Sequence, residues 1–213
     1  MRSRGLPLPT QLRDLCLLSA AIVLLLPGGA QAGTVSGLVT TAGQPGARPL
    51  DPKANPVVVW VDGPKVSVPP VERPVLAQRS VQFSSPLLVA VAGQTVDMPN
   101  DDDVAHNVYS LSGAKRFNLG IYDKGKMKSV TFDEVGLVDV LCSIHRRMTA
   151  KILVVPNPYY ALTAAGSRYQ IKGIPAGTYS LHTWSKGLPD TQQGIVVTEN
   201  GELTLNLSLA DEK

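Results

Sequence analysis

The sequence predicts an all-β protein, and three observations support this fold class. Short runs rich in β-branched and aromatic residues recur along the chain, as in residues 55–63 and 148–155. The 19 glycines and 17 prolines fall largely between such runs, where they favour turns. Amphipathic helical periodicity is hard to find after the first 32 residues. Strands at this spacing are typical of a β-sandwich or β-barrel.

The first 32 residues predict a secretory signal peptide. Arg2, Arg4 and Arg13 give a positively charged start, and residues 15–26 form an apolar run that is too short to span a bilayer. A proline–glycine break and a small-residue cleavage signal ending at Ala32 follow. We therefore expect cleavage after Ala32 and export to the periplasm. No later segment is long and apolar enough to predict a membrane span.

Removal of this peptide changes both the charge and the cysteine content. The formal net charge falls from +3 to +1, because three arginines and one aspartate leave with the peptide. Such a balance does not predict binding to nucleic acid or to anionic membranes. Cys16 leaves as well, so the mature chain keeps Cys142 alone and cannot form an internal disulfide. A bound metal would protect this thiol from oxidation, and the alternative is a buried, inert cysteine.

The predicted strands are separated by two proline-rich segments. Residues 67–77 indicate a linker or crossover, and residues 156–158 break the strand pattern again. In chain order, the predicted strand runs are 34–43, 55–63, 80–85, 86–94, 95–100, 105–111, 128–132, 136–142, 148–155, 168–184 and 201–209.

One short motif carries metal chemistry. Cys142, His145 and Met148 have the spacing C-x2-H-x2-M, in the tight connection between two predicted strands, and His106 lies in an earlier strand run. Two imidazoles and a thiolate in a plane, with a weak axial thioether, are the ligands of blue copper sites. This set suits both copper oxidation states, so little rearranges when an electron moves. The sequence therefore predicts one copper ion held by His106, Cys142, His145 and Met148.

Other chemistries fit these residues less well. Thioether is a poor zinc ligand, and no four-ligand structural zinc spacing is present. A cysteine nucleophile would need an oxyanion hole and a third orienting group, which no motif supplies. The chain has three histidines, and His182 alone cannot build the further all-histidine copper sites of multicopper enzymes. We therefore expect a single-electron carrier rather than an enzyme. Two alternatives stay open: a periplasmic copper-binding or delivery protein without electron-transfer turnover, and a structural or interaction module with a vestigial copper loop.

Residues 78–155 resemble the cupredoxins, the small blue copper proteins. The resemblance rests on V-x-G-x-x-V at 91–96, N-D-x4-H-N at 100–107, and F-x-x-x-G…C-x2-H…M at 132–148. The short ligand loop is more similar to that of amicyanin than to that of plastocyanin. The resemblance implies a Greek-key β-sandwich, copper on the same four residues, and an asparagine, Asn107, that braces the ligand loop. Val140 and Arg146 depart from the usual aromatic and proline at their positions.

The two ends of the chain resemble the two halves of another module. Residues 34–63 and 164–209 resemble a carboxypeptidase-regulatory-like (transthyretin-like) β-sandwich, and the whole mature chain resembles bacterial methylamine utilization proteins, which pair the two modules. We expect residues 33–70 and 157–213 to form this sandwich, with a cupredoxin domain at 71–156 inserted into it. The alternative is a single larger sandwich without a boundary.

Charged residues beside the motif suggest how a partner would dock. Arg146 and Arg147 follow His145, and two cations there would favour a redox partner protein with an acidic patch. The alternative is a pair of solvated surface arginines. Asp101, Asp102 and Asp103 precede His106, and we interpret them as a turn rather than as a second metal site.

Overall fold

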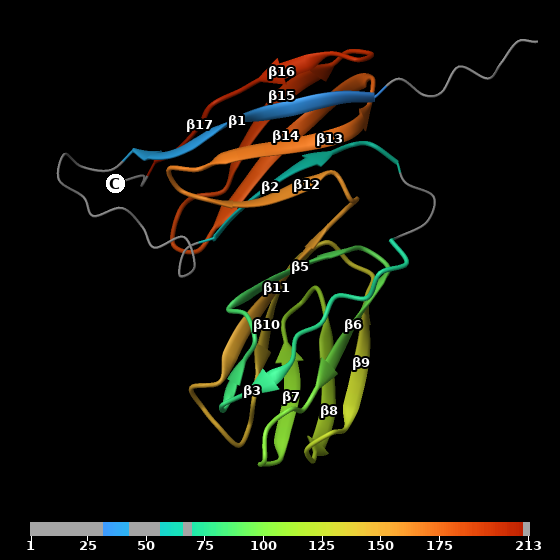
Figure 1. Cartoon of the computed structure of the whole chain (residues 1–213), viewed down its shortest axis with the longest axis vertical. Coiled ribbons are helices and arrows are strands. Elements are labelled where there is room, and N and C mark those ends of the chain that lie inside the picture. Colours follow the sequence, from blue (N-terminus) through green and yellow to red (C-terminus); the bar gives the residue numbers. More distant parts are fainter. Residues whose placement is uncertain (1–31, 43–55, 66–69, 211–213) are drawn as a thin grey trace, which may run out of the picture.

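The computed structural model describes residues 32–42, 56–65 and 70–210, and it is all-β, as the sequence predicts. The predicted signal peptide lies outside the described residues, except for Ala32, which begins the first strand. Within the described ranges no helix is long and apolar enough to cross a membrane. Figure 1 shows two groups of strands stacked one above the other.

The lower group, called here the middle sandwich, is built from consecutive strands between residues 78 and 155. Its larger sheet has the order β5-β11-β10-β7-β8, and β6 pairs with β9 across the core from it. A short hairpin, β3-β4, precedes them. The bounds are β3 (Gln78–Arg79), β4 (Gln82–Phe83), β5 (Leu87–Val91), β6 (Gln94–Pro99), β7 (His106–Leu111), β8 (Arg116–Tyr122), β9 (Met127–Phe132), β10 (Gly136–Leu141) and β11 (Thr149–Val155).

Alternating side chains fill the core of the middle sandwich. Val96 and Met98 point inward from β6, because every second residue of a strand faces the same side. Val138 and Val140 of β10 meet them from the larger sheet, together with Ile152 of β11. Cys142 and Met148 belong to the same buried cluster, so the candidate metal residues lie at the edge of this core.

The upper group, called here the end sandwich, combines strands from both ends of the chain. One sheet has the order β13-β1-β16, with β17 also paired to β1, and the other has the order β12-β2-β14-β15. The bounds are β1 (Ala32–Ala42), β2 (Pro56–Asp62), β12 (Tyr160–Ala164), β13 (Arg168–Pro175), β14 (Gly177–Ser185), β15 (Thr191–Val197), β16 (Glu202–Thr204) and β17 (Leu207–Ala210).

Strand β1 has a glycine, Gly37, where the segment between β16 and β17 approaches its backbone closely. The backbone amide of Leu205, between β16 and β17, donates to the carbonyl oxygen of Ser36 at 2.8 Å. A methyl carbon placed on Gly37 would lie 1.9 Å from the Leu205 carbonyl oxygen. Only glycine therefore fits here without a shift of the backbone.

The two sandwiches share a buried apolar layer, called here the seam. Strand β2 is buried on both faces: Val57, Val59 and Val61 face the core of the end sandwich, and Val58 faces the middle sandwich. The buried residues of the seam are Val58, Leu87, Val89, Val91, Leu153, Val155 and Trp184.

The seam bears on the predicted domain boundaries. The strands between residues 78 and 155 pair only with one another among the described strands, and an insertion between 71 and 156 stays a prediction. The seam, however, joins the two sandwiches through buried apolar side chains that come from both of them. Independent folding of the segment 71–156 therefore stays a prediction.

Candidate metal centre

A tight loop at the end of the β10–β11 hairpin carries three of the predicted ligands. Cys142 follows β10 directly, and Met148 immediately precedes β11. The amide of Cys142 donates to the Met148 carbonyl oxygen at 3.3 Å, and the amide of Met148 donates to the His145 carbonyl oxygen at 2.9 Å. These two bonds close residues 142–148, called here the ligand loop.

Strand β7 brings His106 to this loop. His106 is the first residue of β7, which is paired with β10 at Tyr109 and Leu141. Because Leu141 directly precedes Cys142, this pairing places the start of β7 beside the ligand loop. His106 is fully buried and Cys142 is 4% exposed, whereas His145 is half-buried.

The three donor atoms form a compact triangle. His106 Nδ1 lies 3.1 Å from His145 Nδ1 and 4.0 Å from Cys142 Sγ, and the distance from Cys142 Sγ to His145 Nδ1 is 3.8 Å. A triangle with these sides has a centre about 2.1 Å from each corner, and protein nitrogen and sulfur ligands bind Zn²⁺ at ~2.0–2.3 Å. The donor set therefore fits one transition-metal ion.

Met148 lies in the core beside this triangle. It is 1% exposed and belongs to the same apolar cluster as Cys142, and its backbone is tied to both Cys142 and His145. The structure thus brings the four residues predicted from the sequence into one place. Axial coordination by the Met148 sulfur stays a prediction.

Asp102 is a further residue of this site, which the sequence analysis assigned only to a turn. Its Oδ2 lies 2.7 Å from His106 Nε2, and its side chain is 12% exposed. Burial raises the pKa of Asp102, but hydrogen bonds from the Val81 amide, the His106 ring and the Ser80 amide outweigh this effect, so the pKa lies below its usual value. The sequence feature that could have indicated this contact is the position of Asp102, four residues before His106.

The family resemblance implies that Asn107 braces the ligand loop, but its side chain forms no hydrogen bond with that loop in the described structure. Its Nδ2 donates to Asn118 Oδ1 on β8 at 2.8 Å, and its own Oδ1 is buried without a hydrogen-bond partner. The side chain therefore links β7 to β8.

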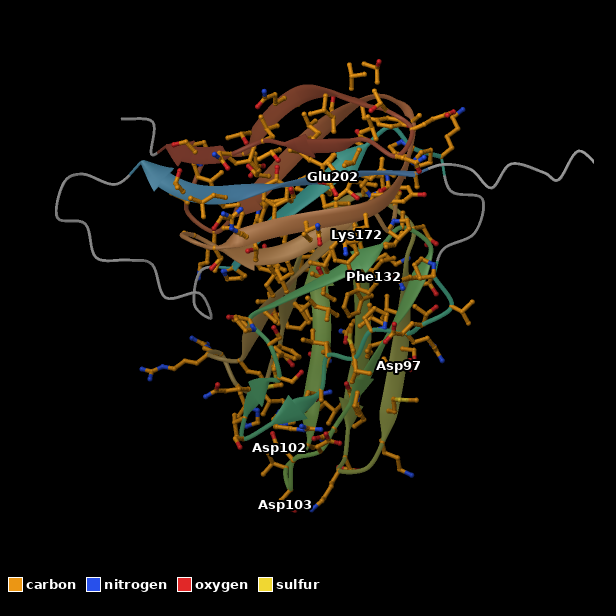
Figure 2. The ribbon with its side chains drawn as sticks, turned by 45° about the horizontal axis from the view of Figure 1, so that its top comes forward. Asp97, Asp102, Asp103, Phe132, Lys172 and Glu202 are labelled. Carbon is orange, nitrogen blue, oxygen red and sulfur yellow. The ribbon has the colours of Figure 1, made fainter. Side chains whose placement is uncertain are left out.

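The metal centre lies at the end of the molecule remote from the end sandwich. Figure 2 shows Asp102 and Asp103 at the lower tip, far from Lys172 and Glu202 of the end sandwich. His182 is not part of the centre, because it lies in β14, where its ring stacks on Trp60 with centroids 5.1 Å apart. The end sandwich thus supplies no residue to the candidate site.

The surface around His145 is cationic and partly apolar. Arg146 and Arg147 are exposed, and neither forms an ion pair with another residue in the described part of the chain. Ile144, on the other side of His145, is 45% exposed. The half-buried imidazole is therefore bordered by two free cations and one apolar side chain.

Comparisons with known proteins give likenesses at the level of structure. No protein-family model matches the chain, and no curated protein matches it. Three of the similar solved structures are an amicyanin variant, a purple cupredoxin and a copper-containing nitrite reductase. A reduced amicyanin variant with a tryptophan-to-tyrosine substitution is 23% identical with a TM-score of 0.38, over 46% of this chain and 98% of that one. A purple cupredoxin from Nitrosopumilus maritimus is 25% identical with a TM-score of 0.34, over 38% and 96%. A copper-containing nitrite reductase from Thermus scotoductus SA-01 is 23% identical with a TM-score of 0.38, over 43% and 24%. Each likeness thus covers less than half of this chain.

Proposed function

We propose that this protein is an exported electron carrier with one type 1 copper ion, held by His106, Cys142 and His145 with Met148 as the axial ligand. The observation that carries the proposal is the triangle of two imidazole nitrogens and one cysteine sulfur around a common centre. Copper would supply a one-electron couple at this position.

The residues around the site determine whether this redox couple would serve electron transfer or catalysis. The buried faces of His106 and Cys142 exclude water from one side, and the ligand loop, closed by backbone hydrogen bonds, holds the donors in place. Four protein donors leave no open position for a substrate. This arrangement favours electron transfer over catalysis, and the half-buried His145 ring is the proposed route by which electrons enter and leave.

The proposed partner is a redox protein with an acidic patch that faces Arg146 and Arg147. Opposite charges at the rim of an interface raise the association rate, and an apolar contact at Ile144 would exclude water around His145. Export to the periplasm, based on the first 32 residues, belongs to the same proposal.

The deciding experiment is the visible spectrum of the copper(II)-loaded protein. We expect an intense blue band from sulfur-to-copper charge transfer, which Cys142→Ser abolishes. Ser143→Ala is the matched control, because Ser143 is an exposed neighbour in the same loop and should leave the band unchanged. A colourless copper(II) wild type would contradict the blue-site assignment. A blue protein with very slow electron self-exchange would instead favour copper storage or delivery.

A further inference from the structure

A strained turn lies beside the candidate metal centre. The β3–β4 hairpin turns at Ser80 and Val81, whose φ angles are 53° and 56°. A β-branched residue at positive φ is a conformational outlier, because its side chain is crowded by the backbone. Val81 is 41% exposed, so burial of its side chain does little to offset this strain.

Both residues of the turn direct their amide groups at one carboxylate. The Ser80 amide donates to Asp102 Oδ1, and the Val81 amide donates to Asp102 Oδ2 at 2.9 Å. Successive amide groups in such a turn form a concave site for an anion. The strained turn therefore points two amide groups at the negative charge of Asp102, which lies 21 residues after Val81.

Asp102 determines which nitrogen of His106 carries the proton. Its ionised carboxylate can only accept hydrogen bonds, so His106 Nε2 must be the donor in their 2.7 Å contact. A neutral imidazole with its proton on Nε2 has a free lone pair on Nδ1. That is the atom that faces Cys142 Sγ and His145 Nδ1.

The hairpin and the segment around Asp102 are joined by further bonds. Arg79 Nε donates to Asp101 Oδ2 at 2.8 Å, and the Asp101 amide donates to the Gln78 carbonyl oxygen at 3.0 Å. The Asp102 amide donates to Asn100 Oδ1 at 2.9 Å. These bonds hold the Ser80–Val81 turn and the Asp102 side chain in a fixed relative position.

We propose that the Ser80–Val81 turn, acting through Asp102, is a positioning element for His106. It holds the ring in the Nε2-protonated tautomer and directs Nδ1 at the metal position. An anionic partner on the far nitrogen makes the imidazole a stronger donor, so this element also favours the oxidised state of the metal. The effect on the metal rests on the proposed function, whereas the effect on the tautomer does not.

The tautomer is tested on the metal-free, full-length protein by nitrogen NMR of the imidazoles at pH 8. We expect His106 to carry its proton on Nε2 in the wild type and to become a mixture of tautomers in Asp102→Asn. Asp103→Asn is the matched control, because Asp103 is exposed and pairs only with Lys124 among the described residues. The same tautomer in wild type and Asp102→Asn would overturn the proposal.

The turn itself is tested by two substitutions at one position. Val81→Gly keeps the amide and relieves the strain, so the His106 tautomer, the copper affinity and the reduction potential should match the wild type. Val81→Pro removes the amide and cannot adopt positive φ, so it should shift all three in the direction of Asp102→Asn. For Asp102→Asn we expect a loss of about 10- to 100-fold in copper affinity and a higher potential.

The controls separate the two proposals. Circular dichroism first establishes that each variant is folded. A folded Val81→Pro variant with wild-type tautomer and potential would remove the turn from the mechanism. If Val81→Pro does not fold, the comparison of Asp102→Asn with Asp103→Asn still decides the role of the carboxylate. If the wild type does not bind copper, the proposed function fails, but the tautomer measurement still decides the positioning role.

Discussion

The backbone amide of Cys142 donates to the carbonyl oxygen of Met148, and this bond places the two sulfur-bearing residues side by side at the base of the ligand loop. The hairpin itself therefore holds the backbones of Cys142 and Met148 together, independently of a metal. This relationship makes Met148 the sharpest test of the proposed ligand set.

Replacing Met148 should change the reduction potential more than the metal content. Met148→Leu roughly conserves volume, so the loss of stability should stay below about 1.5 kcal/mol. Loss of a sulfur donor disfavours copper(II), so the potential should rise, and Met148→Gln should lower it through a harder oxygen donor. Cyclic voltammetry with copper analysis measures both, and Met127→Leu is a control at a residue that is 56% exposed. An unchanged potential in Met148→Leu would make Met148 a core residue only.

The two arginines after His145 should control the rate with charged oxidants. In the double variant Arg146→Glu with Arg147→Glu, oxidation of the copper(I) protein by ferricyanide at low salt should slow by roughly tenfold, and oxidation by a cationic cobalt complex should accelerate. Stopped-flow rates as a function of salt measure the effect, which screening over about 10 Å at 0.1 M should weaken. Arg168→Glu on β13 is the control. Equal effects on both oxidants would argue against an electrostatic role.

Gly37→Ala should destabilise the end sandwich. The added methyl group would meet the Leu205 carbonyl oxygen at 1.9 Å, so we expect a cost of at least about 1–3 kcal/mol. Gly194→Ala is the matched control, because nothing lies within 4 Å of the position of its methyl carbon. Thermal melts followed by circular dichroism and by the blue band show whether the end sandwich unfolds separately. No loss of stability in Gly37→Ala would contradict the close approach at β1.

The segment 71–156 should fold and bind copper by itself, whereas residues 33–70 alone should be unfolded. In the isolated segment the outer faces of β5 and β11 lose their cover, so we expect it to self-associate. Val89→Thr with Leu153→Thr, both on that face, should restore the monomer. Size-exclusion chromatography and copper binding test this. An unstructured segment, even with copper, would favour one continuous core.

Stability should fall in strongly alkaline solution. Burial raises the pKa of Tyr169 from 10.0 to about 12, and its hydroxyl donates to the Leu205 carbonyl oxygen at 2.8 Å. The folded state retains this proton while the unfolded state loses it, so this stabilisation is fully present below pH 10 and is lost as the pH rises toward 12. Denaturant unfolding of Tyr169→Phe should show about 1 kcal/mol lower stability at pH 7. It should also show a pH dependence weaker by about 2–3 kcal/mol between pH 10 and 12. Parallel curves for both proteins would contradict this.

The sequence predicted those features that depend on local pattern. The predicted strand runs that end at Cys142 and begin at Met148 are recognisable from their β-branched residues, and the ligand spacing follows from the loop between them. Strand β8 was missed, since it is an edge strand with mostly exposed or half-buried residues. The run at 80–85 was predicted as one strand, but Ser80 and Val81 form a turn at positive φ, which nothing in their residue types favours. The contact of that turn with Asp102 depends on tertiary structure, and so does the seam.

The pairing of β1 with β17 has a consequence for the order in which the molecule folds. The Leu38 amide donates to Asn206 Oδ1, 168 residues later, and β1 runs parallel to the last strand of the chain. The end sandwich therefore completes its sheets only after synthesis has reached β17. The strands of the middle sandwich join partners much nearer in sequence, and short loops close at a lower entropic cost. The middle sandwich is thus expected to form first and to hold the two halves of the end sandwich close together until β17 has been added.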